Sequence, residues 1–189
     1  MKNNQTKFIL VISAIAVAAL FRLIPHWPNF TPMATIALMG GALLANRFMG
    51  FIIPLIALLI SDVLTITLIN YQWITVEDYF TSPSTLVLYL SFIAITALGL
   101  LLRNRQSWSN LATASLASAL VFFIISNFGD WLGNTLPKTF AGLLATYELG
   151  IPFFSYNLLG NLFYTFLFFG IFHFIYSKNP QLAKETVRK

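Results

Sequence analysis

The chain has 189 residues, of which 58% are hydrophobic and only 9% are charged. A soluble globular domain carries about 25% charged residues, so this composition excludes a soluble fold and indicates an integral membrane protein. The net charge of +5 is therefore attributed to basic residues on cytoplasmic loops, and we expect no nucleic-acid partner. Cysteine is absent and there are only two histidines, His26 and His173, so we expect no disulfide, cofactor or metal centre.

Long apolar runs divide the chain into candidate membrane-spanning helices. A spanning helix needs about 20 mainly apolar residues. We predict one all-α transmembrane domain, residues 1–189, in which six spans form a helix bundle and lie at about 7–24, 32–46, 51–69, 84–102, 109–127 and 151–176.

The first and second runs each raise a specific question. Basic residues, an apolar stretch and the small residues 16–18 could mark a signal peptide at the start of the chain, but we favour a retained helix.

The second run is short, and its Gly40–Gly41 pair predicts close packing against a neighbouring helix instead of exposure to lipid.

Charged residues between the runs predict the orientation. With both termini in the cytoplasm, nine of the eleven basic residues fall on the inner side, and only Arg22 and Lys138 fall on the outer side. Four acidic residues fall outside and only Glu185 falls inside. Because basic residues accumulate on cytoplasmic loops, we predict an inner-membrane protein with N-in, C-in topology.

The two long connections, residues 70–83 and 128–150, both lie on the predicted outer side. Their length predicts ordered structure within them. Residues 137–149 begin with a proline at a helix-start position and are expected to form a short helix at the outer interface. The outer face is therefore where a functional site is expected.

Asp62 is an acidic residue inside the third run. It lies about 16 Å along a helix that starts at Phe51, close to the bilayer centre. A carboxylate at this depth costs a few kcal/mol or more, and such groups usually serve function. We expect a ligand or ion contact or a proton-carrying group in a cavity, and the alternatives are a structural ion pair to Arg22 or a carboxyl that stays protonated.

The segment after the first run gathers Arg22, His26, Trp27 and Asn29 among several prolines. His26 lies between Pro25 and Pro28, which favours an extended backbone. The segment is interpreted either as a rigid binding surface or as a stiff turn into the second helix, and Arg22 could instead extend toward lipid headgroups.

Polar residues recur in the last two runs. Asn157, Asn161 and Tyr164 share one helical stripe, which predicts either interhelical hydrogen bonds or the wall of a polar cavity. The fifth run ends with further candidate ligand-binding residues, Asn127, Asp130 and Trp131. Tryptophan and tyrosine are concentrated on the outer side, which favours a pocket for a flat organic ligand over a simple two-sided aromatic belt.

Small residues in the first run form a different signal. Ala14 and Ala18 are spaced four residues apart on one helical face. Such pairs mostly let helices of one chain pack closely, and docking of a partner helix is the alternative.

Four blocks of the sequence resemble a known bacterial family. The blocks "RLIPHWPNFTPMATIALMGGALL", "PLIALLISD", "SNFGDWL" and "GIPFFSYNLLGNLFY" cover about residues 22–170. They resemble uncharacterised membrane proteins of transport type, which are similar to the substrate-binding S-components of energy-coupling factor vitamin transporters.

This resemblance implies a six-helix S-component-like bundle with a ligand pocket near the outer face. It also implies that Ala14 and Ala18 could meet a membrane coupling subunit, with ATP hydrolysis carried out by partner ATPases. Solitary members of the class transport without such a module. Where the family's last block carries an acidic residue, this chain has Asn161, which weakens a cation or proton role there.

The expected function is membrane transport, in which an outward pocket captures a small vitamin-like organic nutrient. The proposed pocket residues are Arg22, His26, Trp27, Asn29, Asp62, Asn127, Asp130, Trp131, Asn157 and Asn161. Within this set, Trp27 and Trp131 are expected to stack on the ligand. The alternative is a non-transporting subunit of a larger membrane complex. The chain shows no phosphate loop and no nucleophile–base pattern, so we expect no enzyme activity.

Overall fold

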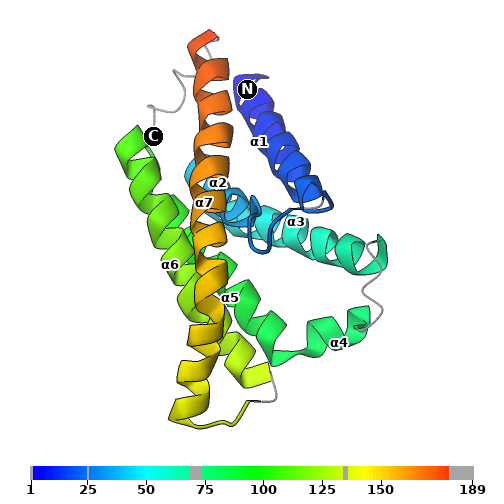
Figure 1. The fold of residues 1–189 in the computed structure, drawn as a ribbon. Helices are drawn as coiled ribbons and strands as arrows, with labels where there is room; N and C mark the ends of the chain where they lie inside the picture. The colour runs from blue at the N-terminus through cyan, green and yellow to red at the C-terminus, as the bar shows by residue number, and fades with distance from the viewer. Residues whose placement is uncertain (1, 25, 69–73, 134–135, 179–189) are drawn as a thin grey trace.

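The computed structural model describes residues 2–24, 26–68, 74–133 and 136–178. These residues form seven α-helices and no strand (Figure 1). The helices are α1 (Lys2–Phe21), α2 (Met33–Leu43), α3 (Arg47–Leu68), α4 (Val76–Thr81), α5 (Pro83–Leu101), α6 (Trp108–Gly133) and α7 (Phe140–Lys178).

Four of the helices, α3, α5, α6 and α7, are long and apolar enough to cross a membrane. The apolar part of α1, Phe8–Phe21, and the whole of α2 are shorter. The all-helical prediction is confirmed, and each of the six predicted runs contains a helix. At 1.5 Å per residue, α2 is only about 16 Å long, about half the thickness of the hydrocarbon core.

Helix α2 lies in the middle of the bundle, and all eleven of its residues are buried. It packs against α3 and α5, and also against α1, α6 and α7. A Cβ atom at Gly41 would lie 2.1 Å from the carbonyl oxygen of Thr96 on α5, and one at Gly40 would lie 2.3 Å from the ring of Pro54 on α3. The predicted close packing of this glycine pair is confirmed.

The C-terminal end of α2 is tied to α5 by Arg103. Its guanidinium donates hydrogen bonds to the carbonyl oxygens of Gly41 (2.8 Å), Leu44 (2.5 Å) and Ala45 (3.2 Å). The last carbonyls of a helix carry partial negative charge and have no partner within the helix. A cation at this position therefore stabilises the end of α2.

Helix α7 corrects the prediction of a separate short helix at residues 137–149. The helix starts at Phe140, after Thr139 accepts a hydrogen bond from the backbone of Gly142 (3.2 Å), and continues without interruption to Lys178. Pro152 lies inside it. Proline removes one backbone bond, but helices in membranes tolerate this loss where neighbouring groups satisfy the backbone. The resulting helix is about 58 Å long and exceeds the total thickness of a bilayer.

The predicted order in the outer connections is confirmed in part by α4. Thr75 caps this helix by accepting a hydrogen bond from the backbone N–H of Asp78 (3.0 Å). Tyr71 and Trp73, counted among the outer aromatic residues of the sequence, lie outside the described residues, as do Pro25 and the inner charges Lys184, Glu185, Arg188 and Lys189.

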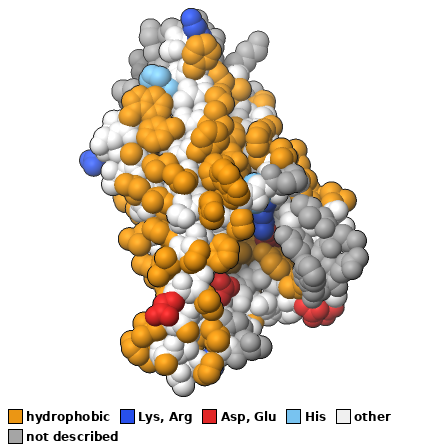
Figure 2. Space-filling model, viewed as in Figure 1, with side chains coloured by type: hydrophobic (Ala, Val, Ile, Leu, Met, Phe, Trp, Pro, Cys, Tyr) orange, Lys and Arg blue, Asp and Glu red, His pale blue; other side chains and the backbone are white. Residues whose placement is uncertain are grey.

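The start of α1 and the end of α7 lie at the same end of the molecule (Figure 1). On the face shown in Figure 2, acidic atoms lie in the lower half and basic atoms lie mainly in the upper half, where α1 begins and α7 ends. Hydrophobic side chains cover most of this face, and a hollow with basic and acidic atoms interrupts them.

Candidate ligand-binding site

A cavity of about 730 Å³ opens between the segment after α1 and helices α2 to α7. Six of the ten predicted pocket residues line it, although they come from distant parts of the chain. They are Arg22, His26, Asn29, Asp62, Asn157 and Asn161. The remaining wall is mainly apolar and includes Met33, Leu58, Ile66, Leu88, Phe92 and Phe122.

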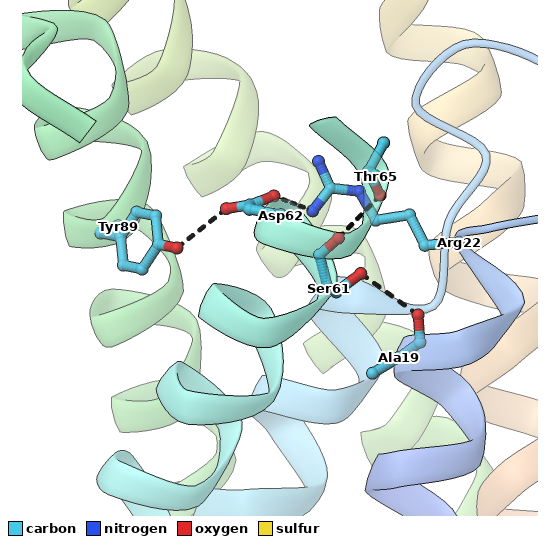
Figure 3. Close-up of polar contacts among 6 residues, drawn as sticks. All are labelled: Ala19, Arg22, Ser61, Asp62, Thr65 and Tyr89. Carbon is cyan, nitrogen blue, oxygen red and sulfur yellow. Dashed lines mark hydrogen bonds and ion pairs between the residues drawn. The ribbon is translucent and has the colours of Figure 1, made fainter. Parts of the chain in front are cut away.

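Arg22 and Asp62 form an ion pair at the wall of this cavity (Figure 3). The Arg22 Nη1 group donates to Asp62 Oδ1, and the Tyr89 hydroxyl on α5 donates to Asp62 Oδ2 over 2.8 Å. The Asp62 side chain has no exposed surface, whereas 22% of the Arg22 side chain remains exposed. Of the alternatives for Asp62, the ion pair with Arg22 is therefore present, and both carboxylate oxygens have partners.

Two hydroxyl groups beside Asp62 donate hydrogen bonds to backbone carbonyls. One bond joins α3 to α1, and the other stays within α3. Ser61 donates to the carbonyl oxygen of Ala19 (3.2 Å), and Thr65 donates to the carbonyl oxygen of Ser61 (2.7 Å) (Figure 3). Since Ala19 lies three residues before Arg22, this contact holds the end of α1 beside Asp62. The ion pair thus forms between two helices that are already fixed to each other.

Tyr79, on the short helix α4, lies near the same pair and lines the cavity. Burial, reinforced by the nearby Asp62 carboxylate and opposed by Arg22, raises the pKa of Tyr79 to about 12. The hydroxyl is therefore protonated over the physiological pH range and can act as a hydrogen-bond donor toward the Asp62 carboxylate.

The segment after α1 presents polar and aromatic side chains to different surroundings. Trp27 packs against Tyr156 with ring centroids 5.8 Å apart, and Phe30 packs against Phe163 and Tyr164 of α7. Asn29 adopts a positive φ of 61°, a conformation that asparagine tolerates better than most residues. Arg22, His26 and Asn29 line the cavity, while the aromatic residues anchor the segment to α7.

Trp27 differs from its predicted role. It is not among the residues that line the main cavity; with His26 it lines a separate depression on the outside of the segment, and 62% of its surface is exposed. Its indole therefore anchors the segment through Tyr156 and does not face the ion pair. His26 donates a hydrogen bond from Nδ1 to the carbonyl oxygen of Trp27 (2.8 Å), which orients its ring.

Asn157 and Asn161 lie on the cavity side of α7, and both are buried. Asn161 donates from Nδ2 to Asn157 Oδ1 over 3.4 Å. Tyr164, the third member of the predicted stripe, packs instead against Phe21, Phe30 and Phe168. The stripe therefore combines a polar wall with aromatic packing farther along the helix.

Asn127 and Asp130 line a second cavity of about 350 Å³. This cavity shares Asn29, Phe122 and Asn157 with the main cavity, so the two adjoin. Asn127 is buried and donates to the carbonyl oxygen of Phe123 in the preceding turn (2.7 Å). The predicted single pocket is thus divided between two chambers.

Trp131 lines neither of these chambers. Its indole N–H donates to the carbonyl oxygen of Pro137 (3.1 Å), and the Lys138 ammonium lies 5.8 Å from the centre of its ring. Trp131 therefore connects the end of α6 to the segment before α7 and lies outside both chambers.

Ala14 and Ala18 face the core of the same chain. Ala18 has no exposed surface, and Ala14 packs against the buried hydrophobic cluster. The pair therefore lets α1 approach its own neighbours, α2 and α3. Within the part of the chain that the structure describes, no group of three or more histidine or acidic residues could hold a metal ion.

Sequence reasoning missed the two tyrosines that approach Asp62. Tyr89 lies in an apolar span with no other charged or aromatic polar residue, and no spacing rule links it to a carboxylate 27 positions earlier. Tyr79 follows a recognisable helix start, a threonine three residues before an aspartate, but only the folded chain shows that this short helix lies over the cavity.

The four long apolar helices define an α-helical membrane protein. The chain matches DUF6580, described as a family of unknown function, over residues 2–182, and it belongs to that family. No curated protein and no solved structure matches it.

Proposed function

We propose that this protein is a substrate-binding membrane transport protein that captures a small vitamin-like organic nutrient, in the manner of an S-component. The observation that carries the proposal is the cavity of about 730 Å³, which gathers charged and amide side chains within apolar walls. Pockets for small organic molecules typically measure about 300–1,000 Å³ and combine an apolar lining with a few polar groups. The sequence resemblance to transport-type proteins points to the same function.

The proposed setting is the bacterial inner membrane, with six membrane segments and both termini in the cytoplasm. The distribution of basic residues supports this orientation, because cytoplasmic loops accumulate lysine and arginine. The common end of α1 and α7 would then be cytoplasmic, and the cavity, bounded by the segment after α1, would open outward.

Transport powered by ATP would require partner proteins, since the sequence has no phosphate loop. A membrane coupling subunit with its ATPases is the proposed partner module. Ala14 and Ala18 pack internally, so such a subunit would contact outward apolar side chains of α1 such as Ile9 and Val17, which are 61% and 49% exposed.

Native mass spectrometry of the purified protein tests whether the cavity holds a small molecule. We expect a bound organic molecule in the wild-type protein and its loss in Leu88→Trp, since Leu88 lines the cavity and a larger ring would fill it. Leu90→Trp is the matched control, because Leu90 lies on the same helix and is 55% exposed. Equal occupancy in both variants, or none in the wild type, contradicts the proposal.

A second candidate function is a non-transporting subunit that assembles a larger membrane complex. It is favoured by the pairing of polar groups within the chain, Arg22 with Asp62 and Asn161 with Asn157. In that case purified protein carries no small molecule, and crosslinking in membranes captures a defined protein partner instead.

A further inference from the structure

We propose that the cavity selects an uncharged, planar ligand with an amide-like edge and discriminates against anions and cations of the same shape. This inference rests on the proposed function, because it names the class of molecule that the same cavity binds. It follows from the charges that line the cavity and from the hydrogen-bonding positions that the protein leaves open.

Asp62 is the one acidic residue among those that line the main cavity. Its side chain has no exposed surface, and its two oxygens accept hydrogen bonds from Arg22 and Tyr89. A cationic ligand would have to displace one of these donors, and it would stand beside the positive charge of Arg22. The site therefore disfavours a cation.

The charge of Arg22 is already compensated by Asp62. A carboxylate ligand on Arg22 would place two negative charges around one positive charge in a site with apolar walls. Burial of an uncompensated charge is costly in a low-dielectric environment. An uncharged acceptor adds no net charge and avoids this cost.

Arg22 and the two asparagines of α7 keep hydrogen-bonding positions open toward the cavity. Figure 3 shows one terminal nitrogen of Arg22 directed at Asp62 and the other pointing away from it. Guanidinium carries five N–H donors, and Asp62 and Tyr79 occupy only part of them, so donors remain for a ligand. On α7, the bond from Asn161 Nδ2 to Asn157 Oδ1 leaves Asn157 Nδ2 as a donor and Asn161 Oδ1 as an acceptor. A carboxamide or cyclic amide edge offers both complementary groups.

The apolar wall defines the rest of the ligand. Phe92 and Phe122 face the cavity together with Leu58 and Leu88, so the body of the ligand is expected to be flat and apolar.

Three probes of one shape test the inference: 2-naphthamide, which is neutral; 2-naphthoate, which is an anion; and 2-naphthamidine, which is a cation. Their affinities for the detergent-purified full chain are measured by saturation-transfer NMR at probe concentrations up to about 1 mM. We expect 2-naphthamide to bind at least about tenfold more tightly than either charged probe, an estimate that reflects the cost of burying an uncompensated charge. Its signal should disappear in Leu88→Trp and persist in Leu90→Trp.

The variant Asp62→Asn gives a second, directional test. It removes the negative partner of Arg22, so the preference should shift by about tenfold or more toward 2-naphthoate, because the arginine charge is then uncompensated. If this variant folds and keeps the wild-type order, the inference is overturned. If it does not fold, the order of the three probes on the wild-type protein decides the question.

The results separate this inference from the proposed function. Equal or tighter binding of either charged probe by the wild-type protein overturns the inference, and so does a failure of all three probes to bind. In both cases the proposed function is judged independently, by the small molecule that copurifies with the wild-type protein and is lost in Leu88→Trp.

Discussion

The two ends of α2, α3 and α5 are built in opposite ways. At one end, Gly40 and Gly41 of α2 bring its backbone against Pro54 of α3 and Thr96 of α5, and Arg103 closes the end of α2. At the other end, the same helices separate around a cavity of about 730 Å³. There, Asp62, Tyr89 and Arg22 connect the helices through side chains instead of backbone contact.

This difference shows how a small bundle can hold a cavity and remain ordered. Close backbone approach at the glycine end fixes the helices without polar side chains. The cavity end then needs specific bonds, because groups that line a space cannot gain from close packing.

The largest expected effect comes from Arg22→Ala at the cavity end. The change leaves the Asp62 carboxylate buried without its cation, and loss of one partner of a buried pair costs about 3–5 kcal/mol of unfolding free energy. Denaturant unfolding in detergent micelles measures this loss. The double variant Arg22→Leu/Asp62→Leu should recover most of the stability, since it leaves no unpaired charge. A double variant as unstable as Arg22→Ala would show that the charge pairing is not the cause.

A smaller effect is expected from Gly41→Ala at the glycine end. The new Cβ atom would lie 2.1 Å from the Thr96 carbonyl oxygen, so α2 and α5 must separate, at a cost of about 1–3 kcal/mol. Gly170→Ala is the control on α7, where the nearest atom, on Trp108, is 3.7 Å away. That variant should be neutral or more stable by up to about 1 kcal/mol. Equal effects at both positions would contradict the account of the glycine end.

The smallest expected effect is the pH dependence from Tyr79. Its pKa in the folded protein is about 12, above the ordinary value of 10.0. Between these two pH values the unfolded chain releases the proton and the folded chain retains it, so stability falls as pH rises through this window. Tyr79→Phe has no such proton and should lose less stability between about pH 9 and pH 11. Unfolding midpoints of both proteins at the two pH values measure the difference, and parallel losses would contradict the assignment.

The sequence predicted the positions of the membrane helices because long apolar runs are a strong and local signal. It also predicted the tight packing at Gly40 and Gly41, since adjacent glycines in an apolar run have few other uses. It did not predict that residues 140–178 form one helix, because Pro152 ordinarily ends a helix in water and the effect of the membrane environment is not local.

The candidate site was predicted in part, and the reason differs from residue to residue. Arg22, Asp62 and Asn161 are polar groups at membrane depth. The free-energy cost of placing such side chains in the membrane is enough to identify them as candidates. The excess of aromatic residues on the predicted outer side favours Trp27 and Trp131 as ligand contacts, but the direction of a side chain depends on tertiary contacts. Tyr156 and Pro137 provide those contacts, and no pattern in the sequence pairs them with the two indoles.

The burial of α2 also has a consequence for the order in which the protein is made. A helix of 11 residues is too short to cross the hydrocarbon core alone, and every one of its residues is covered by other parts of the chain. During biosynthesis it therefore has no stable place in lipid until α3 and α5 have been synthesised and have inserted beside it. The centre of the bundle is thus expected to be completed late, by helices that emerge from the ribosome after α2 itself.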